Sequence, residues 1–467
     1  MRLEDDNQST ENLKEHLKRI EQMFSSGNEF YFDTDVLLEI VDHFLDQDEV
    51  AKANKVISYS RHLHPSNADL MLKEAEILIG SFGFQKALSL LNQIEKIEPW
   101  SEDVHILKAE VYGHLKREDS CIDSYKKAYE LSDEKVDVLF SVARAYQDFG
   151  KIEKAITILK QILHKEPLNE LAISEITFCY EILDQARKAI PFHQYYVDEK
   201  PFSDIAWYNL GGVFSRVEEY EKSIEAYEFA IALSPDFASA YFNKANSLFH
   251  AAKYEDALTT YFETFEYETP DDITYCYIGE CYERLDRLQE AETYFDKSVS
   301  ANEHNPGSWA GKAICLSAKD ENTKALICSA KSLELDELNV EFLKIHGEIL
   351  EKLERHDDAL DTFRKMIDVE PEDPDAWLDY AAFFYRNNLI EEACEVLKVG
   401  LMICEDCASV LFTYASYQYL RGNEQTAKEY FEKGLLSDFN QRQVFFDLLP
   451  YSKSNTTFAN LVELYKK

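Results

Sequence analysis

A small side chain recurs at twelve places along this chain, each one 34 residues after the last. The positions are Ala53, Ala87, Cys121, Ala155, Ala189, Ser223, Ala257, Ala291, Ala325, Ala359, Ala393 and Ala427. Six prolines keep the same spacing: Pro65, Pro99, Pro167, Pro201, Pro235 and Pro371. A fixed period of about 20 to 50 residues is typical of proteins built from stacked repeats. The period therefore predicts an array of structural repeats in which each unit contacts its neighbours.

We divide the chain into twelve units and place position 1 of the first unit at Thr34. The units begin at residues 34, 68, 102, 136, 170, 204, 238, 272, 306, 340, 374 and 408, and they cover residues 34–441. Residues 1–33 are expected to form an acidic segment and a capping helix with an apolar stripe at Leu13, Leu17, Ile20 and Phe24. Residues 442–467 are expected to form a degenerate repeat and a C-terminal cap. Neither end is long enough for a catalytic domain, so we expect function on the repeat surface.

Each unit carries two helical patterns. Position 4 is large and position 8 is small, as in Trp207 and Gly211, which places both on one face of a helix. The small residue at position 20 is followed by an aromatic residue at position 24, such as Tyr227, on the face of a second helix. Proline at position 32 ends that helix, because proline cannot continue one. No alternating strand pattern competes, so the fold class is predicted to be all-α.

The unit at residues 204–237 resembles the tetratricopeptide repeat. The residues that carry the resemblance are Trp207, Leu210, Gly211, Phe214, Tyr227, Ala230 and Pro235. The units that begin at 204, 238 and 272 match the pattern well; those at 102 and 306 match less well, and Ser329 replaces the aromatic residue in the 306 unit. The resemblance implies a right-handed superhelical solenoid of about twelve helix-turn-helix units whose first helices line the concave face. It also implies a role in protein interaction.

Charge and composition exclude several classes of partner. The net charge of −39 argues against DNA, RNA and anionic membranes as ligands, because these are bound by clustered Lys and Arg. The same charge favours a cationic protein partner, or it serves only to keep a long array soluble. No run of 18 apolar residues occurs, and the acidic, polar start differs from a signal peptide. Nine cysteines without the spacing of a disulfide framework fit a reducing compartment, so we expect a cytoplasmic protein without membrane insertion.

The sequence carries no motif of a catalytic, cofactor or metal site. Phosphate-binding, dinucleotide-binding, zinc-protease and nucleophile-elbow motifs are all missing. Cys404 and Cys407 form the single C-x-x-C pair, and no second pair lies nearby to complete a zinc site. His62 and His64 likewise lack a third ligand. We therefore expect no enzyme activity, no cofactor and no metal.

The first helix of each unit packs through positions 4, 8 and 11, so positions 2, 5, 6, 9, 12 and 13 are expected to face the superhelix axis. In the first three units these positions form an acidic groove of Asp35, Glu39, Asp42, Asp69, Glu76, Asp103 and Glu110, with Lys73 almost alone against them. This groove predicts a Lys/Arg-rich partner segment. The 306 unit is expected to be nearly bare there, with Gly307, Ala310, Gly311 and Ala318.

The centre of the array has a different character at the same positions. Its candidate peptide-binding residues are Tyr208, Asn209, Arg216, Phe242, Asn243, Asn246, Tyr277, Glu280 and Arg284. Asparagine side chains both donate and accept hydrogen bonds, so Asn209 and Asn243, which share position 6, can hold an extended peptide backbone of any sequence. Common ancestry with other proteins of this type is the alternative explanation for these residues.

Two functions remain open at this point. The first is an adaptor that binds protein or peptide segments along its concave face. The alternative is a structural scaffold subunit of a larger assembly that has no free peptide ligand. The sequence names neither the partner nor the oligomeric state.

Overall fold

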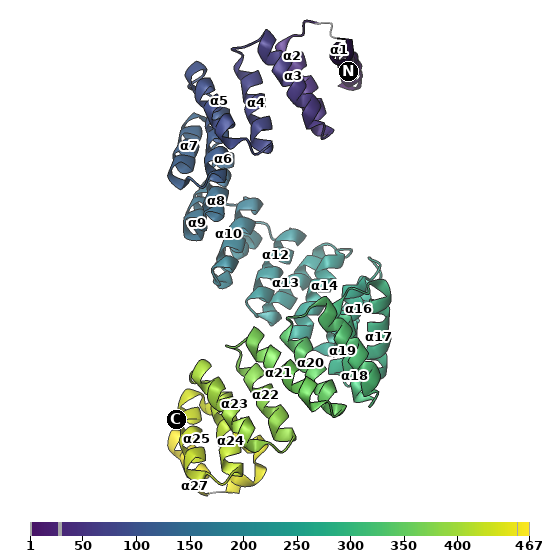
Figure 1. Cartoon of the computed structure of the whole chain (residues 1–467), viewed down its shortest axis with the longest axis vertical. Helices are drawn as coiled ribbons and strands as arrows, with labels where there is room; N and C mark the ends of the chain where they lie inside the picture. The colour runs from purple at the N-terminus through teal and green to yellow at the C-terminus, as the bar shows by residue number, and fades with distance from the viewer. Residues whose placement is uncertain (1, 27–29, 455, 467) are drawn as a thin grey trace. The chain divides into compact units, whose positions relative to one another are not determined.

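A computed structural model describes residues 2–26, 30–454 and 456–466 of the chain (Figure 1). These residues form α-helices and three short 3₁₀ helices, and no strand occurs among them. The predicted all-α fold is therefore confirmed. The chain falls into two compact parts: an N-terminal part, Met1–Glu219, and a C-terminal part, Tyr220–Lys467.

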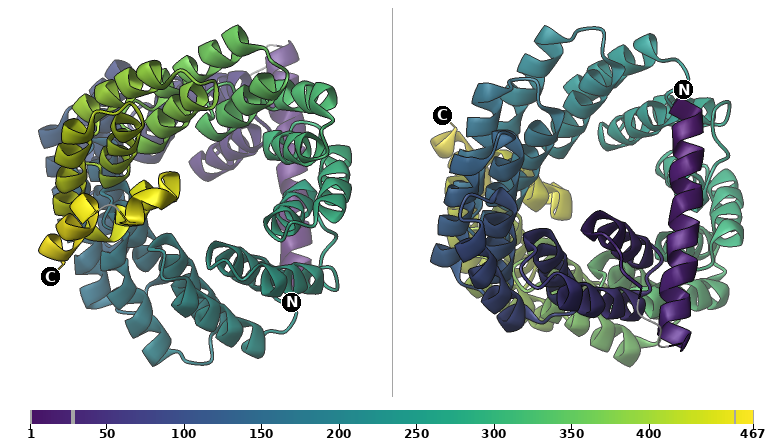
Figure 2. Two further views of the ribbon diagram at one scale, coloured as in Figure 1. Left: turned by 90° about the horizontal axis from the view of Figure 1, so that it is seen from below. Right: turned by 90° about the horizontal axis from the view of Figure 1, so that it is seen from above.

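Most helices come in pairs that follow one another along the chain. The N-terminal part contains α1 (Arg2–Ser26), α2 (Thr34–Asp46), α3 (Val50–Leu63), α4 (Ala68–Gly80), α5 (Phe84–Ile97), α6 (Glu102–His114), α7 (Glu118–Leu131), α8 (Lys135–Asp148), α9 (Ile152–Lys165), α10 (Glu170–Ile182), η1 (Ala186–Ala189), α11 (Ile190–Glu199) and α12 (Asp204–Arg216). Within this part, consecutive helices from α1 to α10 pack on one another, and α11 packs on α12. Figure 1 labels most of these helices, and Figure 2 shows the chain from two further sides.

The C-terminal part continues the same alternation of first and second helices. It contains α13 (Tyr220–Leu233), α14 (Ala238–His250), α15 (Tyr254–Thr264), α16 (Asp272–Arg284), α17 (Leu288–Ala301), α18 (Pro306–Ala318), α19 (Asn322–Leu335), α20 (Val340–Lys352), α21 (His356–Val369), α22 (Pro374–Arg386), α23 (Ile390–Ile403), α24 (Ala408–Leu420), α25 (Glu424–Ser437), η2 (Phe439–Arg442), α26 (Gln443–Leu448), η3 (Pro450–Ser454) and α27 (Thr456–Tyr465). Eleven first helices begin at the residue that opens a 34-residue unit, and α8 begins one residue earlier. The division into twelve repeats remains our interpretation of this spacing.

The start of many first helices is fixed by a capping side chain at position 34 of the preceding unit. Its side chain accepts a hydrogen bond from a free N–H group of the first turn. The residues that cap in this way are Asn67, Ser101, Asn169, Ser203, Asp271, Asn305, Asn339 and Asp373. Because these caps recur at the same position of the 34-residue unit, the helices that follow them begin at the same position of each unit.

The small residues of the period are buried in the contact between the helices of a pair. All twelve, from Ala53 to Ala427, are at most 1% exposed. Aromatic residues four positions later, such as Tyr261, Phe295 and Phe363, are fully buried. A small side chain lets the helix backbones approach, and the aromatic ring fills the space beside them.

A left-handed residue reverses the chain inside each helix pair. Twelve residues with φ between 54° and 82° recur every 34 residues, at Asp48, Phe82, Lys116, Gly150, Asp184, Glu218, Ala252, Asp286, Asp320, Glu354, Asn388 and Gly422. After such a residue the chain folds back on the preceding helix, as where the N–H of Lys253 donates to the carbonyl of Leu248 (2.9 Å). Only two of the twelve are glycine, the residue that adopts this conformation without strain. The left-handed position was not predicted from the sequence.

The ends of the chain pack onto the neighbouring helices. Ile20 of α1 is fully buried, and Leu13 and Leu17 pack on the same apolar cluster with α2 and α3. Phe445 and Phe458 are buried beside α24 and α25. Residues 1 and 27–29 of the expected N-terminal cap lie outside the described residues. The naming of these ends as caps is still an interpretation.

Candidate binding face of the first helices

We call the side chains at positions 2, 5, 6, 9, 12 and 13 of the first helices the first-helix face. A groove of about 590 Å³ lies on this face between α8 and α10. It is lined by Phe140, Ser141, Ala143, Arg144, Gln147, Leu159, Leu171, Glu175 and Phe178. The groove is therefore built from two successive first helices of the N-terminal part, with one residue from α9.

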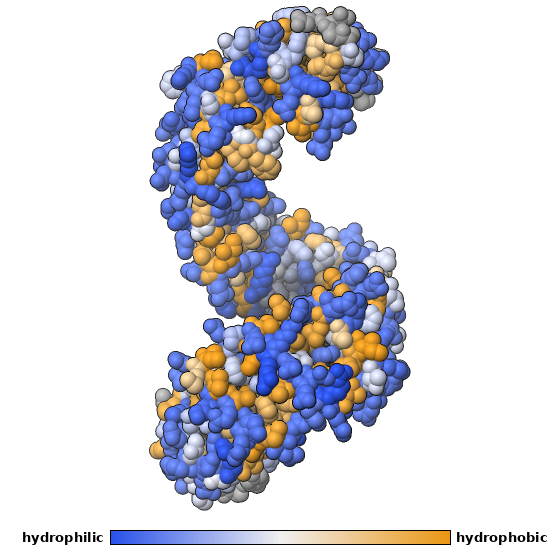
Figure 3. All heavy atoms as spheres, viewed as in Figure 1, coloured by the Kyte–Doolittle hydropathy of each residue, from blue (hydrophilic) through white to orange (hydrophobic). Residues whose placement is uncertain are grey.

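An exposed apolar stripe runs along α10 at this groove. Leu171 is 56% exposed and Phe178 is 53% exposed, and Ile182 continues the stripe one turn further. Their spacing of seven and four residues keeps them on one side of the helix. Ile205, at the matching position 2 of α12, is also exposed. Single exposed apolar residues are common on protein surfaces, whereas several on one side of a helix favour a site of interaction. Figure 3 shows one face of the molecule, with hydrophobic residues in orange among hydrophilic residues in blue.

Two polar side chains of the groove, Gln147 and Arg144, differ in whether they have a partner among the described residues. Gln147 donates from Nε2 to the Glu175 carboxylate across the groove (2.9 Å). Arg144 is exposed at the groove and forms no ion pair with any described residue. The groove thus combines apolar surface with a cation that is available to a carboxylate.

The predicted residues of the acidic groove lie at the surface of α2, α4 and α6. Each of the seven predicted residues is exposed: Asp35, Glu39, Asp42, Asp69, Glu76, Asp103 and Glu110. Lys73 neutralises part of this charge, because its Nζ lies 3.0 Å from Asp42 and 2.7 Å from Glu76. The remaining carboxylates keep this face acidic.

Two of these acidic residues share a cavity. Glu76 and Glu110 line a space of about 370 Å³ together with Ile79, Gly80, Phe82, Phe84, Leu107 and His114. The rings of Phe84 and His114 stack, with their centroids 4.7 Å apart. The cavity therefore brings two carboxylates, one of them paired with Lys73, together with two stacked rings, which suits the aliphatic stem and charged head of a Lys or Arg side chain.

The central candidates are divided between the two parts of the chain. Tyr208, Asn209 and Arg216 lie on α12 of the N-terminal part, and the other six lie on α14 and α16 of the C-terminal part. Arg216 is already engaged, because its guanidinium pairs with Glu181 of α10. Arg216 thus joins successive first helices rather than presenting a free cation.

The aromatic candidates of the C-terminal part form one cluster. The ring of Tyr277 lies 6.0 Å from the ring of Phe242 and 6.0 Å from that of Tyr261, with which it is nearly parallel. The Tyr261 hydroxyl donates to Oδ1 of Asn246. This bond fixes the carboxamide of Asn246 and leaves its amide group as the donor toward a ligand.

Glu280 is held in an environment that disfavours its charge. Burial raises the pKa of Glu280 to about 7, and the nearby carboxylates of Glu341 and Glu283 act in the same direction. The Cys276 thiol, 3.6 Å from Oε1, and Arg284 act in the opposite direction. Glu280 therefore changes its charge close to neutral pH.

The expectation for the 306 unit is wrong at two of its four positions. Ala310 and Gly311 were expected on the first-helix face, but both are buried in α18. The reason is packing, because α18 contacts the flanking first helices α16 and α20, and the ring of Phe295 enters the space that a side chain on Gly311 would fill. Position in the unit alone does not determine exposure where first helices pack tightly.

The groove between α8 and α10 was missed from sequence although the signal is present. Phe140 and Arg144 occupy positions 5 and 9 of the 136 unit, and Leu171 and Phe178 occupy positions 2 and 9 of the 170 unit. The same position rule that selected the acidic and central residues selects these. The predicted site residues lie in the units before and after the 136 and 170 units, and none was predicted in these two.

Membrane spans and metal sites are both absent from the residues that the structure describes. No helix there is long and apolar enough to cross a membrane. No group of three or more His, Cys, Asp or Glu side chains in that part of the chain is arranged to hold a metal ion.

Comparison with protein families identifies one type of repeat along the chain. Models described as "Tetratricopeptide repeat" match residues 102–135, 137–169, 208–273, 274–305 and 350–410. No curated protein sequence matches the chain significantly.

Solved structures with a similar fold share little sequence with this chain. YrrB, titled a TPR protein with an unusual peptide-binding site, has a TM-score of 0.32 and 21% identity, covering 39% of this chain and 95% of its own. The APC/C hetero-tetramer Cut9-Hcn1 has a TM-score of 0.43 and 15% identity, covering 85% of this chain and 92% of its own. Naa15/Naa10 bound to HypK-THB has a TM-score of 0.35 and 14% identity, with 92% and 79% covered.

Proposed function

The chain belongs to the tetratricopeptide repeat family, and from this premise we propose that it is a non-enzymatic adaptor whose first-helix face binds extended segments of partner proteins. Family membership supports a protein-interaction role, as adaptor or scaffold. The choice of an adaptor with its own ligand rests on the surface of this chain.

The observation that carries the proposal is the groove between α8 and α10. It places Leu171 and Phe178, both more than half exposed, beside an unpaired Arg144. Fully burying an exposed Leu or Phe side chain contributes about 1.5–3 kcal/mol, and because Leu171 and Phe178 are only slightly more than half exposed, covering each contributes roughly half of that. The groove volume of about 590 Å³ is enough for two or three side chains of a bound segment.

These groups define the chemistry of the segment. Leu171 and Phe178 are seven residues apart on α10, which is about 10.5 Å along the helix axis. We propose that the bound segment places one apolar side chain on each of them and a neighbouring carboxylate on Arg144. The amide group of Gln147 donates to Glu175 and to the Cys179 sulfur, which leaves Arg144 as the anchor for a carboxylate of the segment.

The acidic groove is proposed as a second binding region with the opposite preference. Its support is the cavity in which Glu76 and Glu110 stand above the stacked rings of Phe84 and His114. A Lys/Arg-rich segment fits the exposed carboxylates of α2, α4 and α6. The Asn and aromatic residues of α12, α14 and α16 stay candidates for peptide backbone contacts.

The test is a selection from a library of displayed random peptides against the full chain. We expect enriched peptides with two apolar residues and one acidic residue. Their affinity for the Leu171→Ser/Phe178→Ser variant should fall at least about tenfold, because two exposed hot-spot contacts are removed. Phe202→Ser is the matched control: Phe202 is 87% exposed in the same part of the chain but lies outside the first-helix face. An equal loss in both variants would contradict the proposal.

The alternative function is a structural subunit of a larger assembly. In that case the selection yields no peptide that depends on Leu171 and Phe178, and the native protein sediments as one constant, stoichiometric complex. The cytoplasmic location expected from the sequence stays part of the proposal.

A further inference from the structure

The second helix of the 170 unit differs from its neighbours. In the preceding unit α9 is one continuous α-helix over Ile152–Lys165. Here the corresponding stretch begins as the 3₁₀ helix η1 and becomes α-helical only at Ile190. Pro191 is the cause, because it has no N–H to donate to the carbonyl of Arg187 four residues earlier. The N–H of Ile190 donates to that carbonyl instead, which tightens the turn.

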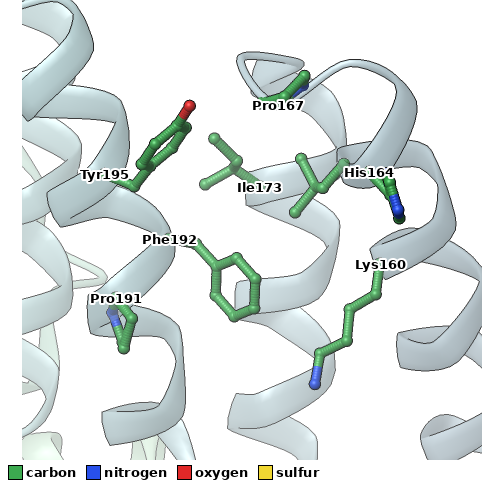
Figure 4. Close-up of a pocket in the computed structure, with 8 residues that line it drawn as sticks. Lys160, His164, Pro167, Ile173, Pro191, Phe192 and Tyr195 are labelled. Carbon is green, nitrogen blue, oxygen red and sulfur yellow. The ribbon is translucent and has the colours of Figure 1, made fainter.

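The broken helix changes what packs on α10. α10 contacts η1 and α9, whereas α11 packs mainly on α12. A cavity of about 370 Å³ opens where α9, α10 and α11 meet. It is lined by Lys160, Leu163, His164, Pro167, Ile173, Pro191, Phe192 and Tyr195. Figure 4 shows Pro191, Phe192 and Tyr195 of α11 facing Lys160 and His164 of α9, with Ile173 between them.

The cavity is separate from the first-helix face. Its walls come from the second helices α9 and α11, and its single residue from a first helix, Ile173, is at the packing position 4. The apolar lining is partly open, since the Tyr195 side chain is exposed beside it. Binding here does not depend on the groove between α8 and α10.

Two basic side chains at the cavity, Lys160 and His164, form no ion pair with the residues that the structure describes. Lys160 Nζ lies over two aromatic rings, 5.7 Å from Tyr180 and 5.9 Å from Phe192, and forms no ion pair with a described residue. His164 in the last turn of α9 is also without an ion pair among these residues. By contrast, the neighbouring Lys165 bonds to the Tyr129 hydroxyl. In a chain with 88 acidic and 49 basic residues, an unpaired cation at an apolar cavity is free to receive a carboxylate from outside.

We propose that this cavity is a second docking site, which takes an acidic partner segment that inserts one bulky apolar side chain between Ile173 and Phe192 and places a neighbouring carboxylate on Lys160. The volume of about 370 Å³ is near the lower limit of ligand sites, which hold about 300–1,000 Å³, and suits one Leu or Phe side chain. The apolar walls supply affinity, and the positive charge of Lys160 selects an acidic segment, whereas the acidic groove is proposed to take a Lys/Arg-rich one.

The test measures binding of short synthetic peptides to the full chain by fluorescence anisotropy. The probe peptide has one Phe flanked by Asp and Glu; one reference peptide has Lys in place of the acids, and another has Ser in place of Phe. We expect the probe alone to bind. Its affinity should fall about tenfold with Lys160→Glu and with Tyr195→Ser, and should be kept with Lys160→Arg. Lys165→Glu is the matched control, because it reverses a charge on the same helix, more than one turn away and outside the cavity lining.

Several results would overturn the proposal. These are failure of the probe to bind, equal binding of the Lys-containing peptide, or equal loss with Lys160→Glu and Lys165→Glu. An uncharged apolar dye that binds as well as the probe would make this a small-molecule site. Self-association of the chain that is abolished by Lys160→Glu would assign the cavity to a second copy. The Leu171→Ser/Phe178→Ser variant should leave probe binding unchanged, so failure of the first-helix proposal is distinguishable from failure of this one.

Discussion

The ring of Phe295 occupies the space that a side chain on Gly311 would need. A Cβ atom built on Gly311 would lie 2.2 Å from Cζ of Phe295, and Phe295 itself is fully buried. Gly311 in α18 thus lets the aromatic residue of α17 reach across to the next unit. The contact between successive units depends here on the absence of a side chain.

Replacing Gly311 by alanine should destabilise the C-terminal part by about 1–3 kcal/mol, because a fully buried ring must move. The measurement is thermal and urea unfolding of the full chain. Gly80→Ala is the control, since nothing lies within 4 Å of a Cβ atom there and alanine favours the helix. Adding Phe295→Leu should restore part of the loss. A Gly311→Ala variant as stable as the wild type would contradict the packing of α17 against α18.

The left-handed turn predicts opposite effects at two adjacent alanines. Ala252 has φ +57°, whereas Ala251 before it has φ −77°. Ala252→Gly should stabilise the fold by about 0.5–1 kcal/mol, because glycine adopts a positive φ without strain. Ala251→Gly should destabilise it, because there glycine only gains freedom in the unfolded state. Changes of the same sign in both variants, measured by thermal unfolding, would be inconsistent with this turn.

Glu280 predicts a pH dependence of stability. Its pKa is raised from an ordinary value of 4.5 to about 7, so the folded state holds the proton more tightly than the unfolded state. The wild type should therefore lose stability relative to Glu280→Gln as pH rises from about 4.5 to about 7, and the difference should level off above that range. Urea unfolding of both proteins at several pH values measures this difference. A difference that does not vary with pH would show that Glu280 titrates normally.

The acidic groove predicts a salt-dependent affinity for a Lys-rich peptide. Binding should weaken steeply between about 0.1 and 1 M salt, as the Debye length falls from about 10 to 3 Å. Glu76→Gln/Glu110→Gln should weaken it further at low salt. Asp119→Asn/Glu130→Gln removes the same charge from exposed positions of α7 and is the matched control. If both double variants weaken peptide binding equally, the affinity depends on the net charge of the protein and not on the acidic groove.

The sequence was sufficient for the helices and their main contacts, because these repeat. Small residues such as Ala155 and large ones such as Tyr261 recur where the helices touch, and all are buried. The departures from the repeat could not be predicted from the period, because they arise from single residues that differ from the pattern. Pro191 breaks one second helix and opens a cavity, and Gly311 turns a face position into a packing position. The left-handed position could not be predicted because many residue types occupy it, including Phe82 and Lys116 as well as glycine.

The central claim, that partner segments dock on the first-helix face, is tested most directly by photo-crosslinking. A photoreactive phenylalanine analogue is placed at Phe178 or, as reference, at Phe202, and the full chain is irradiated with a peptide from the selection described above. The account predicts a crosslinked product from position 178, competed by unlabelled peptide, and none from position 202. Crosslinking from position 202 alone, or equally from both, would contradict it.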